Sequence, residues 1–267
     1  MVRSKAWSAL LTALALAGSS IRSQARKHLL GYSWAIFSPV IYAACFLVVK
    51  RGIGQSEAPD VEHSLSILRA FVGVTMMQAW IQLLQEMSGL IRRNKSLLRG
   101  MNISEKPLVL AVLLEALFGL GIRSLTVLLA LAFLGLKLPA GYLDWVWIAV
   151  SLLVLLVSSA ALGFILAPWA ALYPDVKKAI SSATLPLMLL SPVFYVATTQ
   201  TDSVLFWVNC INPVAPILAT LMDTFSGQAP FYKAPLLLWL GMGSVLLVLA
   251  MGKLKRQIPI LLERLGS

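Results

Sequence analysis

The sequence predicts an all-α integral membrane protein with an N-terminal amphipathic interfacial helix, six transmembrane helices and short re-entrant outer gate helices between spans 5 and 6. Of its 267 residues, 59% are hydrophobic and only 12% are charged, and the mean hydropathy is +0.84. Soluble domains carry about twice that share of charged residues. Each of six apolar stretches approximately supplies the roughly 20 helical residues that cross a bilayer. They cover residues 33–49, 65–87, 108–134, 145–172, 180–199 and 235–251.

The basic residues predict how these spans are oriented. With six crossings, four segments share one side of the membrane, namely 1–32, 88–107, 173–179 and 252–267, and they hold 16 of the 22 lysines and arginines. Cytoplasmic loops retain lysine and arginine, so both termini are expected in the cytoplasm. The net charge of +11 lies on short loops beside the spans. Anionic lipid therefore explains this charge better than nucleic acid does.

No motif for catalysis or metal binding is present. The sequence has no GxxxxGK[ST] loop for ATP, no HExxH pair, two histidines and two cysteines. We therefore expect one membrane domain over residues 1–267, without a cofactor of its own and driven by a separate subunit. Within this domain, residues 1–32 form the cytoplasmic interfacial helix, 33–251 the six-span core and 252–267 a cytoplasmic tail.

The first 26 residues can be interpreted in two ways. Basic residues, an apolar run and Ser23-Gln24-Ala25 resemble a cleaved signal peptide, whose removal would invert the topology. The same stretch also has helical periodicity, which favours an uncleaved amphipathic helix in the cytoplasmic interface. The apolar positions of that helix are Trp7, Leu10, Leu11, Leu14, Gly18, Ile21 and Ala25.

Residues 203–222 are apolar enough to suggest a seventh crossing, but a seventh crossing would place the basic C-terminus outside. The stretch contains Asn212-Pro213, and proline interrupts helices. We therefore expect two short helices, broken at Asn212-Pro213, that enter the outer leaflet and return. Non-helical backbone at that depth must be buried in protein or face water, so this segment is a candidate gate.

Four landmarks carry a resemblance to a known family. Leu30-Gly31, Trp34 and Pro39 form the pattern LGxxWxxxxP, Tyr173-Pro174-Asp175 is a short acidic loop, Ser191-Pro192 and Tyr195 form SPxxY, and Asn212-Pro213 follows. In this order the landmarks resemble the ABC-2 permeases, specifically the branch that exports polysaccharides and polyol phosphates. The acidic loop has Pro174 where that branch usually has arginine. The resemblance covers roughly residues 22–250.

The resemblance implies how the protein works. Such permeases are homodimers in the bacterial inner membrane, each bound to two copies of a separate ABC ATPase that holds ATP and Mg²⁺. The dimer encloses a path for a lipid-linked glycan, and periplasmic or outer-membrane export proteins are further partners. The implied ATPase-coupling residues are Asn94, Lys95, Leu97, Leu98, Arg99, Met101 and Asp175. The candidate substrate path contains Trp34, Phe37, Tyr42, Arg123, Phe194 and Tyr195, and the outer gate contains Asn212 and Pro213.

Each of these roles has a simpler alternative. The segment 88–107 could be a solvated loop that only sets topology, although its leucines give it an apolar side. Asp175 could contribute orientation charge alone. The aromatic residues could belong to the interfacial belt that anchors many membrane proteins. Arg123, in the middle of a span, could form a structural salt bridge with Glu86, or with Glu115 of the other protomer, rather than meet substrate phosphate.

Three other functions remain open from the sequence. The protein could export a small lipid or a drug, although such homologues often carry larger outer domains. It could be a membrane enzyme acting on a lipid-linked sugar with Glu115, Arg123 and Asp175, but these residues are predicted at different depths. It could also be a secondary transporter, which the lack of a detectable inverted repeat disfavours.

Overall fold

The computed structural model describes residues 2–27, 60–100, 105–136 and 138–264, together with six single residues between Phe37 and Val48. Within this part of the chain the structure is helical and contains no strand. The rest of the first predicted span, 33–49, with its residues Trp34 and Tyr42, lies outside the described residues. Met101 also lies outside them.

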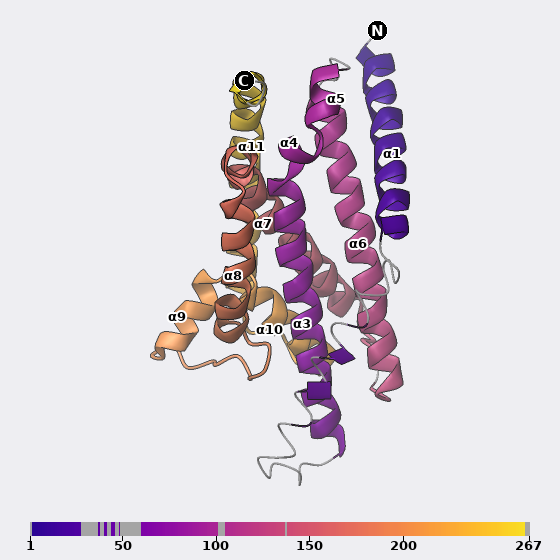
Figure 1. The fold of residues 1–267 in the computed structure, drawn as a ribbon. Coiled ribbons are helices and arrows are strands. Elements are labelled where there is room, and N and C mark those ends of the chain that lie inside the picture. Colours follow the sequence, from indigo (N-terminus) through magenta and orange to yellow (C-terminus); the bar gives the residue numbers. More distant parts are fainter. Residues whose placement is uncertain are drawn as a thin grey trace.

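The described residues form a series of helices. In chain order they are α1 (Val2–Lys27), α3 (Asp60–Ser88), α4 (Leu90–Arg93), α5 (Lys95–Gly100), α6 (Glu105–Phe133), α7 (Tyr142–Leu172), α8 (Asp175–Leu190), α9 (Val204–Ile211), α10 (Ala215–Phe225) and α11 (Lys233–Arg264). Both termini lie at one end of the bundle, and α4 and α5 lie toward that end, which we call the termini end (Figure 1). Helices α9 and α10 lie at the opposite end.

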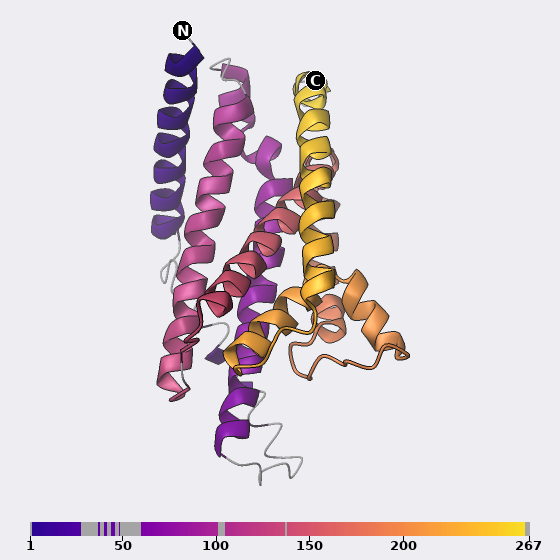
Figure 2. The ribbon, with the colours of Figure 1, turned by 180° about the vertical axis from the view of Figure 1, so that it is seen from behind.

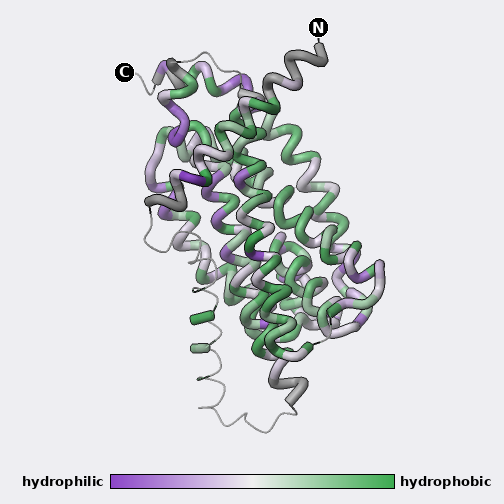
Figure 3. Tube along the Cα trace, turned by 90° about the vertical axis from the view of Figure 1, so that its right-hand side faces the viewer, coloured by the Kyte–Doolittle hydropathy of each residue, from purple (hydrophilic) through white to green (hydrophobic). Residues whose placement is uncertain are grey.

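Four helices are long and apolar enough to cross a membrane. They are Ser64–Ser88, Pro107–Phe133, Tyr142–Leu172 and Lys233–Leu261, and they match the predicted spans 65–87, 108–134, 145–172 and 235–251. The pair α9 and α10 passes the same test together, but its helices are bent by 100°. Figure 3 shows that hydrophobic residues predominate through the middle of the bundle, as a bilayer requires. This is a multi-pass arrangement with four or five candidate spans in the described chain.

The predicted span 180–199 is wrong at both ends. Helix α8 begins at Asp175 and ends after 16 residues at Leu190, and residues 196–200 are neither helix nor turn. Ser191 has an extended backbone (φ −101°, ψ 151°) and precedes Pro192. A residue before proline is driven out of the helical region by the proline ring. At about 1.5 Å per residue, α8 is about 24 Å long, shorter than the bilayer core.

Helix α1 forms as predicted, but its packing differs from the predicted interfacial arrangement. It runs alongside α6 in both views of the bundle (Figures 1 and 2). Ala13 and Ala17, one turn apart, are buried against Ala111 of α6. These small side chains allow a close approach between the two helices. In the predicted apolar stripe, Trp7, Leu11 and Leu14 are exposed, with Trp7 63% accessible. Its residues Leu10, Gly18 and Ile21 are half-buried.

Helix α7 is the centre of the packing and contacts α3, α10 and α11. Five small residues of α7 are all buried, and small residues allow close helix packing: Ser158, Ser159, Ala160, Ala161 and Gly163. A Cβ atom at Gly163 would lie 2.5 Å from Met87 Cβ and 2.9 Å from the Leu84 carbonyl oxygen of α3. The Trp80 indole also donates a hydrogen bond to Ser158 Oγ (3.0 Å). The termini end of α3 is therefore fixed closely against α7.

Candidate functional site

The segment predicted to couple to an ATPase folds as two short helices between α3 and α6. Helix α3 ends at Ser88, and α4 follows with Leu90 and Ile91 fully buried. Asn94 then ends α4, because both its backbone N–H and its side-chain Nδ2 donate to the Leu90 carbonyl oxygen (3.2 and 2.9 Å). A buried apolar anchor thus holds a segment whose basic side chains are partly exposed.

The predicted coupling residues occupy different positions in this segment. Leu98 is buried against the bundle, whereas Asn94, Lys95 and Leu97 are half-buried. Arg99 lies on α5. Asp175, the remaining predicted residue, begins α8 and lies 3.9 Å from Lys178 in a pair exposed on both sides. A solvent-exposed pair of this kind contributes little to stability.

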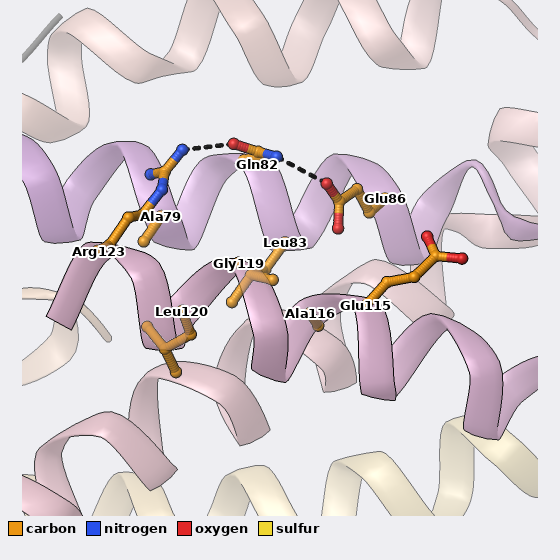
Figure 4. A pocket seen from close by; sticks show the side chains of 9 residues that line it. All are labelled: Ala79, Gln82, Leu83, Glu86, Glu115, Ala116, Gly119, Leu120 and Arg123. Atoms are coloured by element: carbon orange, nitrogen blue, oxygen red, sulfur yellow. Dashed lines mark hydrogen bonds between the residues drawn. The ribbon is translucent and has the colours of Figure 1, made fainter. Parts of the chain in front are cut away.

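Arg123 lies in the contact between α3 and α6, and only 9% of the residue is exposed. Its Nη1 donates to the Thr75 carbonyl oxygen (3.3 Å), and its Nη2 donates to Gln82 Oε1. The Gln82 amide in turn donates to Glu86 Oε1 (2.7 Å). The expected partner Glu86 is therefore reached through Gln82 rather than by a direct salt bridge. Figure 4 shows this chain of three side chains from α6 to α3 and along α3.

Glu115 is paired within its own chain. Arg93 Nη2 of α4 lies 3.0 Å from Glu115 Oε2 of α6, and the Glu115 side chain is only 6% exposed. The alternatives for Arg123 included a salt bridge with Glu115 of the other protomer. Glu115 already has a partner in its own chain, Arg93. An arginine–carboxylate hydrogen bond between ionised groups is stronger than one between neutral groups.

Four charged and amide side chains line a small cavity between α3 and α6, and of these Glu115 and Arg123 are buried, Glu86 is half-buried and Gln82 is exposed. The volume of the cavity is about 20 Å³, which is room for about one water molecule. Two leucines and three small residues complete its lining, and Figure 4 shows the two carboxylates in the same stretch of the contact. We call the four charged and amide residues, with Arg93, the polar ladder. The structure brings Glu115 and Arg123 to one cavity, but Asp175 is exposed on α8, so the three do not form a catalytic site.

At the opposite end, two of the sequence landmarks meet. Asn212 Nδ2 donates to Ser191 Oγ (2.8 Å), and Ser191 Oγ donates to the Leu187 carbonyl oxygen of α8 (2.6 Å). Asn212 Oδ1 accepts from the Val214 N–H (3.0 Å) at the start of α10. The predicted break at Asn212-Pro213 is thus confirmed, and its asparagine ties the break to the end of α8.

Tyr195 strengthens the same connection. Its hydroxyl lies 3.0 Å from the Leu190 carbonyl oxygen and 3.1 Å from Oδ1 of the fully buried Asn209. Tyr232 donates to the Thr198 carbonyl oxygen (2.5 Å), and the Trp239 indole of α11 donates to the Cys210 carbonyl oxygen (3.0 Å). Tyr195 and Trp239 therefore hold α9 directly, and Tyr232 holds the segment that precedes it.

The other residues of the predicted path are not gathered at one place in the described chain. Phe194 packs half-buried against the main core, and Phe37 is 48% exposed. The sequence reasoning also missed Gln82, Asn209 and the Arg93–Glu115 pair. Gln78, Gln82 and Glu86 recur every four residues in one span, a spacing that places them on one helix face and could have revealed a polar contact.

The comparison with protein families agrees with this architecture. Residues 13–226 match the family model described as ABC-2 type transporter, a match that covers most of the 267 residues. No curated protein matches the chain significantly. ABC-2 permeases generally work with a separate ATPase subunit, and the match makes the chain a permease subunit rather than an enzyme in its own right. With its membrane-spanning helices, the chain belongs to the ABC-2 type transporter family and is the transmembrane subunit of an ABC transporter.

Proposed function

We propose that this subunit exports a lipid-linked polysaccharide across the bacterial inner membrane. Two copies form the translocation path, each copy crosses the membrane six times, and two copies of a separate ABC ATPase bind ATP with Mg²⁺ and drive transport. The observation that carries the substrate proposal is the contact of Ser191 and Tyr195 with Asn209 and Asn212. Two of the four sequence landmarks that resemble the polysaccharide branch, SPxxY and Asn212-Pro213, are joined by hydrogen bonds at this end of the bundle.

The orientation follows from the two ends of the bundle. Both termini lie at the termini end, and the basic segment α4–α5 is close to it (Figure 1). Because retained positive charge marks the cytoplasmic side, this end faces the cytoplasm. Helices α9 and α10 then lie at the outer side, where a 100° bend suits a segment that enters the membrane and returns.

The coupling contact is made by α4–α5. Arg92 is exposed and Leu97 half-buried, whereas Leu90 and Ile91 hold the segment on the bundle. A short basic helix pair that is held firmly and still presents side chains outward suits a groove on the ATPase. Asn94, Lys95, Leu97, Leu98, Arg99 and Met101 make or support this contact, with Asp175 at its side.

The glycan path lies between the two copies. Trp34, Phe37 and Tyr42 of the first span line it, and Phe194 and Tyr195 extend it toward the outer gate at Asn212 and Pro213. Aromatic faces pack on sugar rings without selecting one stereochemistry, which suits a polymer of repeating sugars. Arg123 joins this path only when α3 and α6 separate, because its guanidinium is now bound to Thr75 and Gln82.

Inverted inner-membrane vesicles provide the test of the substrate. Vesicles containing the chain and its ATPase receive a lipid-linked oligosaccharide with a labelled sugar, and protection of the label from an added glycosidase measures its transfer into the lumen. We expect protection that requires ATP and is absent from vesicles without the chain. ATP-dependent transfer of a glycan-free lipid, with no protection of the glycan, would indicate a small-lipid exporter and overturn the proposal.

A further inference from the structure

The polar ladder joins the α4–α5 segment to the membrane interior of the same subunit. Arg93, on α4, reaches Glu115 of α6, which lies about ten residues, or about 15 Å, beyond the start of that helix. From Glu115 the ladder continues along the cavity to Glu86, through Gln82, to Arg123. Charged and amide groups therefore line the α3–α6 contact from the termini end toward the middle of α6, with the cavity between Glu115 and Glu86.

We propose that this ladder transmits the movement of α4–α5 to α6, with Arg93 and Glu115 as positioning residues that couple ATP hydrolysis to transport. The proposal rests on the proposed function, in which α4–α5 is the contact with the ATPase. The contacts of α4 favour such a role. Leu90 and Ile91 hold α4 in the core, α4 packs against α7, and the Arg93 side chain provides its ion pair with α6.

The charges of the ladder explain why α6 should follow α4. Glu86 and Glu115 line one cavity, and Arg93 and Arg123 balance them from its two ends. If α4 moved and drew Arg93 away, Glu115 would remain as a buried carboxylate beside a second carboxylate. An uncompensated buried charge is strongly unfavourable, so the state of lower free energy is one in which α6 moves with Arg93.

The packing beside the ladder allows such a movement. Ala79, Ala116 and Gly119 line the same cavity beside Leu83 and Leu120, and a Cβ atom at Gly119 would meet nothing within 4 Å. A contact made only of interdigitated large side chains would resist a displacement of α6 along α3, because a well-packed core has few alternative arrangements. A contact that also contains small residues, a water-sized space and rotatable polar side chains can change register more readily.

The test compares charge changes at neighbouring positions in the permease–ATPase complex reconstituted in liposomes. Arg93→Glu and Glu115→Arg each place like charges together, and the double variant restores an opposite pair. Coupled residues interact strongly in double-mutant cycles. We expect each single variant to retain the ATPase and at least about half of the ATP hydrolysis, but to lower glycan transport per ATP about tenfold. The double variant should recover to within about threefold of the wild type.

Arg256→Glu is the matched control, because it makes the same charge change at an exposed arginine of α11, outside the α4–α5 contact. It should leave transport per ATP within about twofold of the wild type, as surface substitutions usually have small effects. An equal loss in Arg256→Glu and Arg93→Glu, or no recovery in the double variant, would overturn the proposal. Loss of the ATPase from the single variants would assign the pair to docking and would also overturn it.

A second set of variants serves if Glu115→Arg does not fold. Glu115→Gln keeps the shape and removes the charge, and adding Arg93→Gln removes the cation that was its partner. We expect Glu115→Gln alone to lower transport per ATP and the double variant to recover part of it. Equal transport per ATP in the single and the double variant would contradict coupling through the pair. A wild-type chain that recruits no ATPase would instead refute the proposed function, so the two failures are distinguishable.

Discussion

Replacing Arg123 with leucine is expected to destabilise the folded protein by about 3 kcal/mol. Arg123 is buried and donates to the Thr75 carbonyl oxygen and to Gln82, which itself donates to Glu86. Leucine would remove the cation nearest this end of the ladder and leave the Gln82 amide oxygen and Glu86 less well satisfied. Loss of one partner from a buried charged network is much more damaging than loss of both.

Arg123→Leu is expected to change the stability of the folded protein and the free energy of membrane insertion in opposite directions. Leucine in place of arginine makes insertion of the span easier, by about 2.5 to 3.5 kcal/mol at a helix centre. The expected loss therefore appears in the thermal stability of the purified protein in detergent and not in membrane targeting. Arg123→Leu combined with Glu86→Gln should recover most of the stability. A fully stable Arg123→Leu variant would show that the ladder contributes nothing to the fold.

Gly73→Ala is expected to disturb the end of the bundle opposite the termini end. A Cβ atom at Gly73 of α3 would lie 2.8 Å from both Val193 Cα and Val193 Cγ1, and the Cα atom belongs to the backbone that follows Ser191 and Pro192. Because backbone cannot rotate away, α3 and the end of α8 must separate. Overpacking of this kind costs about 1 to 3 kcal/mol. Thermal stability should fall, and the contact of Tyr195 with Asn209 should loosen.

Gly121→Ala is the control for this substitution. Gly121 lies inside α6, and a Cβ atom there would meet nothing within 4 Å. Both changes improve helix propensity by about 1 kcal/mol, so any difference between them reports the contact with Val193. Equal stability of the two variants would mean that α3 does not approach Val193 as closely as the structure shows.

Hydropathy predicted the long spans well because a bilayer imposes their length and composition. Predicted residues 65–87, 145–172 and 235–251 are all helical, and the predicted span 108–134 is helical as far as Phe133. The break at Asn212-Pro213 was also predictable, since proline acts through its own ring and the backbone beside it. The end of α8 was missed although Ser191-Pro192 carries the same local signal, because residues 191–199 are apolar enough to resemble a continuing span.

Contacts between helices were much harder to predict. Periodicity indicated a helix at the N-terminus but assigned its apolar side to Trp7 and Leu14, whereas Ala13 and Ala17 make the contact with α6. Alanine has too little hydrophobic area to stand out in a sequence pattern, yet its small size is what allows two helices to pack closely. The partners of Arg123 and Glu115 depend on which helices are neighbours, and neither charge nor spacing along one chain determines that.

Purification of the tagged chain from mild detergent, with mass spectrometry of the proteins that accompany it, tests whether the chain works with a separate ATPase. We expect a stoichiometric ATPase with a GxxxxGK[ST] loop, and we expect its loss when residues 94–106 are replaced by a Gly/Ser linker. The linker variant must remain dimeric and folded for this comparison. Recovery of an intact dimeric chain without any such ATPase would contradict transport driven by a separate ATPase subunit.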